Sequence, residues 1–415
     1  MEIYLDYNAT APLMPAARAA VVAGLDLLNA SSVHGPGRAA RLAVTTARGQ
    51  VATYLGVRPA QIVFTSSATE ALVTALRGAA AKDYIISAVE HDAVRATIKA
   101  MQENSLLPAG RRCPEGADEG DAKDESENSP SPQNAKLASL TKHFGPLPAG
   151  RGEGFVIPVD PNGLIDLEKL DAMLKTTPAP ALVAVQFVNN ETGVIQPIAE
   201  VMKLCRKYGA LLLCDAVQAV GRIDLAPLQG ADIIVISTHK MGGPKGAAAL
   251  VLREGLSITP LLTGGGQEER RRAGTENVAA IMGIGAAIER VGDSLHGMAQ
   301  LAAWRDAMER EILSALPTVQ IFGRGAARIA NTSMMALPGT PASTQLMNLD
   351  LAGIAVSSGS ACSSGKVGPS HVLTAMGAAP DIASAAIRVS GGWQNTAGDF
   401  RQFTKSYIEM ALRLG

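Results

Sequence analysis

One segment of the chain reads Ala231-Asp-Ile-Ile-Val-Ile-Ser-Thr-His-Lys240 and runs directly into Met241-Gly-Gly-Pro-Lys-Gly246. A continuous apolar run of this length is typical of a strand that is buried on both faces of a sheet. The run ends abruptly in polar side chains before a glycine-rich turn. Because ligands of open α/β sheets bind outside the carboxyl ends of the strands, we expect Ser237, His239 and Lys240 to face a pocket.

Lys240 has two interpretations on this segment alone. In an apolar crevice the pKa of a lysine falls below its ordinary value of about 10.4, which makes the neutral amine available as a base and Schiff-base former. The alternative is a surface lysine at a strand end, with Lys245 as the ligand of a phosphate loop. The run Gly242-Gly-Pro-Lys-Gly246 lacks the spacing of such a loop, and Pro244 removes one of the amides that the loop would use.

Length and composition limit the class of protein. The chain has 415 residues, more than one ordinary core supports, so we expect two or three domains. It is 47% hydrophobic and 18% charged with a formal net charge of −1, which is typical of a globular protein and predicts no nucleic-acid partner and no membrane contact. The first residues do not resemble a signal peptide, and no apolar run is long enough to span a bilayer, so the sequence predicts a cytoplasmic protein.

The four cysteines form no Cys-x-x-Cys pair, which fits neither a disulfide framework nor a zinc site, and we expect no metal.

The segment at about 105–153 contains an acidic run, residues 114–132, that is rich in proline, glycine and serine and has no aromatic residue. Such a run cannot bury enough surface to order itself, so we expect a mobile insertion in which Cys113 is an incidental exposed thiol.

Strands and helices alternate along most of the chain. We expect strands at residues 61–65, 82–87, 155–159, 181–188 and 210–215, and helices at residues 15–28, 39–55, 71–78, 93–103, 167–174 and 201–208. This order predicts an α/β fold with a mainly parallel, mixed sheet and helices on both faces. A long helix around residues 298–316 then leads to a smaller α+β region. We expect a large domain at 13–295 and a small domain formed by 1–12 with 296–415.

Polar residues recur where the predicted strands end. The hydroxyl-rich turn at residues 66–70 precedes a helix N-terminus and is a candidate phosphate cradle, although taken by itself it favours an ordinary N-cap. His91, Asn190 and Asp215 follow three other strands. An amine that forms an imine, together with a carboxylate that keeps a pyridinium nitrogen protonated, is the pair that pyridoxal phosphate needs. The joint placement of these groups with Lys240 favours one pocket for that cofactor.

Ten short motifs along the chain match those of a known family. They are Tyr4-Leu-Asp-Tyr-Asn-Ala-Thr10, Phe64-Thr-Ser-Ser-Ala-Thr-Glu70, Glu90-His91, Asn189-Asn-Glu-Thr-Gly193, Asp215-Ala-Val-Gln218, Ser237-Thr-His-Lys240, Gly242-Gly-Pro-Lys-Gly246, Gly264-Gly-Gly-Gln267, Ala273-Gly-Thr-Glu-Asn277 and Ser357-Ser-Gly-Ser-Ala-Cys362. By these motifs the chain resembles the cysteine desulfurases of the class V aminotransferase family, which are pyridoxal phosphate enzymes of fold type I. The last motif, which ends in Cys362, is typical of the branch that supplies sulfur for iron–sulfur cluster assembly and thiolation.

The resemblance implies a role for each cofactor-binding residue. Lys240 would hold the cofactor covalently and then act as a base. Asp215 would pair with the ring nitrogen, Gln218 would bind the phenolic oxygen, and His91 would stack on the ring. The remaining residues would hold the phosphate: the Ala68 amide, Thr69, Ser237, His239 and, from the second subunit of a homodimer, Thr275.

The resemblance also implies the substrate and the nucleophile. Arg388 and Asn190 would grip the carboxylate of L-cysteine, since the arginine fork matches a carboxylate. Cys362 would attack the substrate sulfur, which would leave L-alanine and a persulfide for a sulfur-acceptor or scaffold protein. Serine and glycine around Cys362 suit a loop that reaches first the cofactor and then an acceptor.

The sequence departs from the family in two places, and two alternative functions stay open. Ser67 stands where the family commonly has glycine, and the 105–153 insertion is longer than the family's usual connection. A selenocysteine lyase, or another class V aminotransferase-like enzyme without a persulfide step, would keep Lys240 and Asp215. A non-catalytic interaction protein on the same fold would bind no cofactor.

Overall fold

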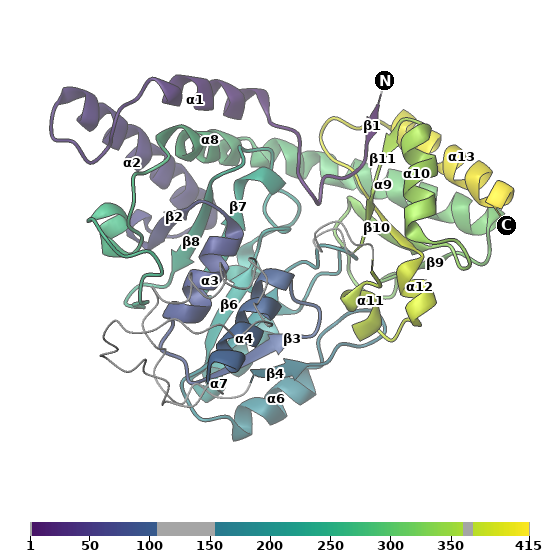
Figure 1. Ribbon diagram of the computed structural model, residues 1–415, viewed down its shortest axis with the longest axis horizontal. Helices are drawn as coiled ribbons and strands as arrows, with labels where there is room; N and C mark the ends of the chain where they lie inside the picture. Colours follow the sequence, from purple (N-terminus) through teal and green to yellow (C-terminus); the bar gives the residue numbers. More distant parts are fainter. Residues whose placement is uncertain (1, 106–153, 360–367, 415) are drawn as a thin grey trace, which may run out of the picture.

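The chain forms two units of unequal size. The computed structural model describes residues 2–105, 154–359 and 368–414 (Figure 1). The larger unit surrounds a seven-stranded sheet and fills the left and lower parts of the view, whereas the smaller unit, at the right, surrounds a four-stranded sheet. The predicted insertion lies almost entirely outside the described residues, so its mobility stays a prediction.

The large sheet has the strand order β2-β8-β7-β6-β5-β3-β4. β3 to β7 run parallel, whereas β8 is antiparallel to both of its neighbours, β2 and β7. The predicted α/β fold with a mainly parallel, mixed sheet is therefore confirmed. The strands are β2 (Ile62–Thr65), β3 (Asp83–Ser87), β4 (Gly154–Ile157), β5 (Ala181–Gln186), β6 (Leu211–Asp215), β7 (Ile233–Ser237) and β8 (Ala248–Leu252).

Helices cover both faces of this sheet. Alternate strand residues face opposite sides, so Val183 packs with one set of helices and Leu182 with the other. α1 (Pro15–Leu25) lies along α8 on the outside (Figure 1). The first face carries α2 (Gly35–Leu55), α6 (Leu167–Thr176), α7 (Ile198–Tyr208) and α8 (Val278–Glu289), and the second carries α3 (Ala68–Gly78) and α4 (Asp92–Ser105).

The smaller unit has its own sheet and its own core. Its antiparallel sheet has the order β12-β13-β10-β9, and β1 (Ile3–Tyr4) pairs in parallel with β11 (Ile354–Ala355) beside it. Leu5 packs in this core with Phe403 and Tyr407. On this basis we propose the division into a large domain at 13–295 and a small domain of 1–12 with 296–415. The other elements are α9 (Val291–Ala315), β9 (Gln320–Ile321), β10 (Thr332–Ala336), α10 (Ala342–Leu351), β12 (Ser357–Ser358), α11 (His371–Ala375), α12 (Pro380–Ser384), β13 (Ala386–Ser390) and α13 (Ala397–Leu414).

Several predicted boundaries were wrong. α2 begins at Gly35 rather than residue 39, because the His34 side chain accepts a hydrogen bond from the Gly37 amide and Pro36 fits the first turn. α3 begins at Ala68 rather than residue 71, because Ser67 caps it. β8 was not predicted as a strand, although its five residues are buried.

Two further findings concern membranes and metals. In the parts of the chain that the structure describes, no helix is both long and apolar enough to cross a membrane. In the same parts, no group of three or more His, Cys, Asp or Glu side chains is placed to hold a metal ion. The cytoplasmic location stays a prediction.

Candidate active site

Four strands of the large sheet end at one edge. Thr65 at the end of β2 and Ser237 at the end of β7 both pair with Ala248 of β8. Asp215, at the end of β6, pairs with Gln186, at the end of β5. The segments that follow these strands therefore start from the same edge, where a sheet of this kind binds its ligands.

Lys240 ends a short 3-10 turn that directly follows β7. Its Nζ donates hydrogen bonds to the carbonyl oxygens of Asn8 and Ala9, both at 2.8 Å. The next turn needs glycine, because Gly242 has a φ of 87° and a Cβ atom there would lie 2.7 Å from the Met14 side chain. The amine is thus held against the N-terminal segment rather than in bulk solvent.

Asn8 contacts several site residues at once, a role that the sequence did not predict although Asn8 lies in one of the matching motifs. It is 1% exposed, and its carbonyl oxygen accepts from Gln218 Nε2 at 2.9 Å as well as from Lys240. Its Nδ2 donates to the Asn190 carbonyl at 3.1 Å, and its Oδ1 accepts from Arg222 Nη1 at 2.9 Å. One asparagine therefore connects three of the predicted site residues.

Arg222 is a second residue that the sequence did not reveal. It is buried and donates to the Lys240 carbonyl at 3.1 Å, to the Tyr7 carbonyl at 3.3 Å and to the Gln218 side chain. Burial, and then the charge of Arg388, lower the pKa of Arg222 to about 9, so it stays protonated at neutral pH. Arg222 fixes the backbone on both sides of the lysine amine.

Two buried carboxyl groups lie at this edge. Asp215 is 6% exposed and accepts a hydrogen bond from the Val217 amide at 2.9 Å. Burial raises the pKa of Asp215, while the Val217 amide and the charges of His91 and Lys240 oppose that rise. Glu90 accepts from the Gln186 amide at 2.6 Å, and burial, followed by the charge of Asp215, raises the pKa of Glu90 well above its usual range. Burial and mutual repulsion thus favour the protonated form of Glu90, whereas Asp215 has an amide donor and two nearby cationic groups that favour its ionised form.

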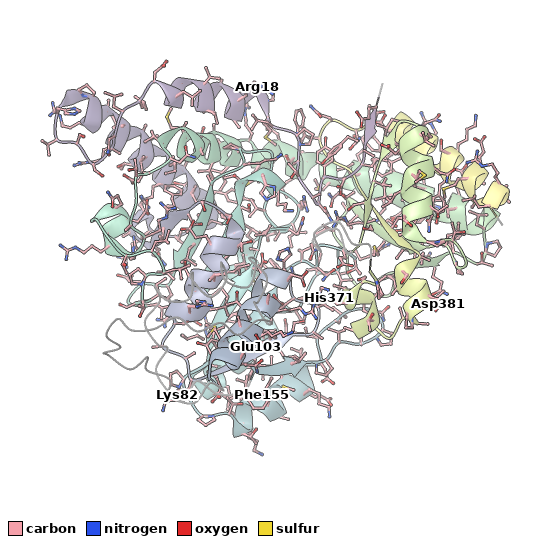
Figure 2. The ribbon with its side chains drawn as sticks, in the orientation of Figure 1. Arg18, Lys82, Glu103, Phe155, His371 and Asp381 are labelled. Carbon is pink, nitrogen blue, oxygen red and sulfur yellow. The ribbon has the colours of Figure 1, made fainter. Side chains whose placement is uncertain are left out.

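Three histidines lie close to these carboxyl groups. His91 Nδ1 accepts from the Ala93 amide at 3.1 Å at the start of α4. Burial, and then the charges of Lys240 and Lys245, lower the pKa of His239 to about 4, so its imidazole is neutral at neutral pH. His371, which the sequence did not reveal, lies at the boundary of the two units in Figure 2, with Nε2 3.0 Å from the Glu90 carbonyl oxygen.

The predicted phosphate turn is an N-capped helix start. Ser67 Oγ accepts from the Glu70 amide at 3.1 Å, as the N-cap interpretation predicts. Ala68 and Thr69 lie in the first turn of α3, and Thr69 is exposed. Burial opposes ionisation of Glu70, but its ion pair with Arg272 at 2.9 Å helps to lower the pKa of Glu70 below its usual range.

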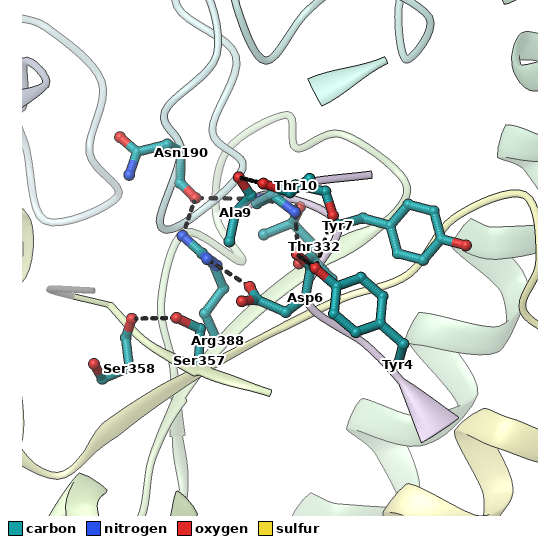
Figure 3. Close-up of polar contacts among 12 residues, drawn as sticks. Tyr4, Asp6, Tyr7, Ala9, Thr10, Asn190, Thr332, Ser357, Ser358 and Arg388 are labelled. Carbon is teal, nitrogen blue, oxygen red and sulfur yellow. Dashed lines mark hydrogen bonds and ion pairs between the residues drawn. The ribbon is translucent and has the colours of Figure 1, made fainter. Parts of the chain in front are cut away.

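Arg388 joins the two units (Figure 3). It comes from β13, is 3% exposed, and donates through Nη1 to the Asn190 carbonyl at 3.0 Å. Through Nη2 it forms an ion pair with Asp6 at 2.7 Å, a partner that the sequence did not reveal. Asn190 Oδ1 in turn accepts from Gln186 Nε2 at 3.3 Å.

Three buried polar atoms at the site lack a protein partner. Glu90 Oε2, Ser237 Oγ and Arg388 Nε have no hydrogen-bond partner among the described residues, although all are shielded from solvent. A buried polar group without a partner costs about 1–3 kcal/mol. Ser237 Oγ and Arg388 Nε can donate a hydrogen bond, so an anionic ligand group at each position would satisfy them.

The structure does not test the placement of two predicted residues. Cys362 lies outside the described residues. Thr275 is exposed, in a loop that its neighbour Arg272 ties to Glu70 of the same chain. Its contact with a second subunit therefore stays a prediction.

Buried Glu191 lies beside both ends of the segment that contains Cys362. Its Oε2 accepts from Ser370 Oγ at 2.5 Å, and a Cβ atom added at Gly359 would lie 2.6 Å from the same oxygen. Burial raises the pKa of Glu191 to about 7, against a lowering by Ser370 and Arg388. The protonation state of the Glu191 carboxyl group, which is packed against Ser370 and Gly359, therefore changes near neutral pH.

Glu191→Gln is expected to change the pH dependence of stability. Between about pH 4.5 and pH 7 an unfolded glutamate loses its proton while Glu191 keeps it, so folding loses free energy as pH rises. The glutamine variant avoids this loss. Relative to the unsubstituted chain, its free energy of unfolding, measured with urea, should be about 2.5 kcal/mol more favourable at pH 8 than at pH 5. An equal difference at both pH values would contradict the assignment.

The chain is similar to known proteins over almost its whole length. The family model described as "Aminotransferase class-V" matches residues 3–107 and 153–403. A cysteine desulfurase of Cereibacter sphaeroides is 36% identical over 407 residues, which cover 96% of this chain and 92% of the relative. A cysteine desulfurase of Klebsiella pneumoniae is 36% identical over 395 residues, 94% of this chain and 87% of the relative. The X-ray structure of a NifS-like protein from Rickettsia africae has a TM-score of 0.80 and 32% identity and covers 99% of both chains.

The fold and the lysine–carboxylate site define a class V aminotransferase of fold type I. Within that class the chain belongs to the cysteine desulfurase family, which its curated relatives show over almost its whole length. The family resemblance drawn from the sequence motifs is therefore confirmed.

Proposed function

We propose that this protein is a pyridoxal phosphate-dependent cysteine desulfurase. It would convert L-cysteine into L-alanine and pass the sulfur to Cys362. The observation that carries the proposal is the convergence on one sheet edge of Lys240, the buried carboxyl group of Asp215 and the unpartnered Ser237 Oγ. When bound, the cofactor would supply an electron sink for the bonds at the substrate Cα.

The residues present fit that cofactor. Lys240 Nζ would hold it and later accept the proton from the substrate Cα. Asp215 would pair with the ring nitrogen, since the Val217 amide and the charges of His91 and Lys240 favour its ionised form against the effect of burial. Gln218, fixed by Asn8 and Arg222, would bind the phenolic oxygen, and His91 would stack on the ring.

The phosphate would lie between the end of β7 and the start of α3. Ser237 Oγ would gain the partner that it lacks, and the neutral His239 would donate without adding charge. The amide of Ala68 and the hydroxyl of Thr69 are in the first turn of α3, where the helix dipole favours an anion. Thr275 would complete the group from the second subunit of a homodimer.

The substrate carboxylate would bind Arg388. Its Nε is buried and lacks a partner among the described residues, while Nη1 and Nη2 are held by Asn190 and Asp6. The fixed guanidinium therefore presents a free donor to a carboxylate, beside the backbone carbonyl of Asn190. The Asn190 side chain, which accepts from Gln186, would bind the same carboxylate.

Cys362 would be the nucleophile. Its thiolate sulfur would attack the substrate sulfur, the carbon–sulfur bond would break, and the sulfur would remain on Cys362 as a persulfide. A sulfur acceptor, such as a scaffold protein for iron–sulfur clusters or a thiolation partner, would then take it. Membership of the cysteine desulfurase family supports this step, because the structure does not describe Cys362.

Simultaneous assay of alanine and sulfide tests the function. The purified protein should show a cofactor absorbance band near the visible and should release both products from L-cysteine in the presence of a thiol reductant. A non-catalytic interaction protein would show neither. A selenocysteine lyase would turn over selenocysteine but leave L-cysteine unchanged.

Arg388→Lys is expected to raise the KM for L-cysteine by at least about tenfold, because an ammonium group cannot contact Asn190 and Asp6 and also offer the planar Nε donor to the carboxylate. The cofactor absorbance should persist. Arg401→Lys, at an exposed position of α13, is the matched control and should behave like the unsubstituted protein. An unchanged KM in Arg388→Lys would contradict the assigned carboxylate site.

A further inference from the structure

Asp6 is the only acidic residue that pairs with Arg388 in the described parts of the chain (Figure 3). The Asp6 side chain is 19% exposed and the Arg388 side chain 3%, so the pair is largely withdrawn from water. Charges in such a place are screened much less than charges on the surface. Any ligand carboxylate that reaches Arg388 therefore also meets the charge of Asp6.

The backbone around Asp6 is held beside Arg388. Tyr4 Oη donates to the Asp6 carbonyl at 3.0 Å and to the Thr10 carbonyl at 2.7 Å. The Ser390 amide donates to the Leu5 carbonyl at 2.8 Å, which ties the segment to the strand that carries Arg388. The segment thus keeps the Asp6 side chain within reach of Arg388, with which it pairs at 2.7 Å.

We propose that Asp6 is a specificity-determining residue, which limits the affinity of Arg388 for carboxylates and restricts the site to amino acids with a single carboxylate. This inference rests on the proposed function, because it assigns the substrate carboxylate to Arg388.

The charges around the pair support this role. Asp6 neutralises Arg388, so one ligand carboxylate already makes the Arg388–Asp6 pair with its ligand net negative. Buried Glu191 lies within electrostatic reach of Arg388, and so does the cation Arg222. The Arg222 guanidinium is engaged by Asn8, Gln218 and two backbone carbonyls. A monocarboxylate can share the guanidinium through its free Nε, whereas a second carboxylate on the ligand would meet Asp6 without a cation of its own.

Asp6→Asn separates charge from shape. Asparagine keeps an acceptor oxygen for Arg388 Nη2 and removes only the negative charge. Calorimetric titration of the holoenzyme with L-alanine should show an affinity about tenfold higher in Asp6→Asn, and L-aspartate should become a measurable ligand. Ethylamine, which has no carboxylate, should bind both proteins equally.

Two further variants make the outcomes distinct. Asp6→Glu keeps the charge, so it should bind L-alanine as the unsubstituted protein does. Asp6→Ser is a second neutral variant, which should shift affinity in the same direction as Asp6→Asn even if the latter fails to fold.

Arg388→Lys separates this inference from the proposed function. If Arg388→Lys weakens L-alanine binding but Asp6→Asn leaves it unchanged or weaker, the role of Asp6 is overturned and the carboxylate site stands. If Arg388→Lys leaves L-alanine binding unchanged, the carboxylate site itself is wrong.

Discussion

Replacing Lys240 with methionine should abolish cysteine turnover and remove the cofactor absorbance band. Methionine has a similar length and is uncharged, so the side-chain volume is nearly kept while the amine is lost. The Nζ atom is held at 2.8 Å by two carbonyl oxygens, and no other described lysine lies in that position. We expect the rate of alanine formation to fall by at least about a thousandfold, since both the covalent attachment and the base are removed.

The control for this variant is Lys245→Met. Lys245 lies five residues further along and is exposed, so its loss should leave the absorbance and most of the activity intact. Turnover that survived in Lys240→Met but fell in Lys245→Met would favour the alternative in which Lys245 is the functional lysine.

Replacing Cys362 with alanine should abolish sulfur transfer but keep the cofactor. The variant lacks the thiolate that attacks the substrate sulfur, whereas Lys240, Asp215 and Ser237 are unchanged. Sulfide release from L-cysteine should fall by at least about a hundredfold, while the absorbance band and its shift on adding L-cysteine should persist. Loss of sulfide release with retention of the cofactor would distinguish a cysteine desulfurase from a class V aminotransferase-like enzyme that uses Lys240 but has no persulfide step.

The matched control is Cys113→Ala. Cys113 lies in the acidic insertion, which the sequence predicts to have no part in catalysis, so this variant should release sulfide at the original rate. Equal sulfide release from Cys362→Ala and the unsubstituted chain would show that the persulfide step is wrong.

Much of the fold follows from local patterns. Short apolar runs with a polar end predicted β3, β5, β6 and β7, because a buried strand in a parallel sheet is apolar on both faces. The same polar ends predicted that Asp215 and Lys240 would share a sheet edge. Capping was harder to predict: the segment before α2 contains proline and glycine and looked like a loop, yet His34 caps a helix there.

The supporting contacts of the site could not be predicted in this way. Asn8 and Arg222 are 214 positions apart and meet only in the folded chain, and no local periodicity marks either residue. Asp6 likewise meets Arg388 across 382 positions. The sequence thus identified residues by their chemistry at strand ends, whereas the residues that orient them depend on long-range contacts.

The central claim is that sulfur from L-cysteine becomes attached to Cys362, and the mass of the protein after incubation with L-cysteine tests it most directly. The account predicts an added sulfur atom on the peptide that contains Cys362, which a thiol reductant removes and which is missing in Lys240→Met. An unchanged mass, or sulfur found on another cysteine in place of Cys362, would contradict it.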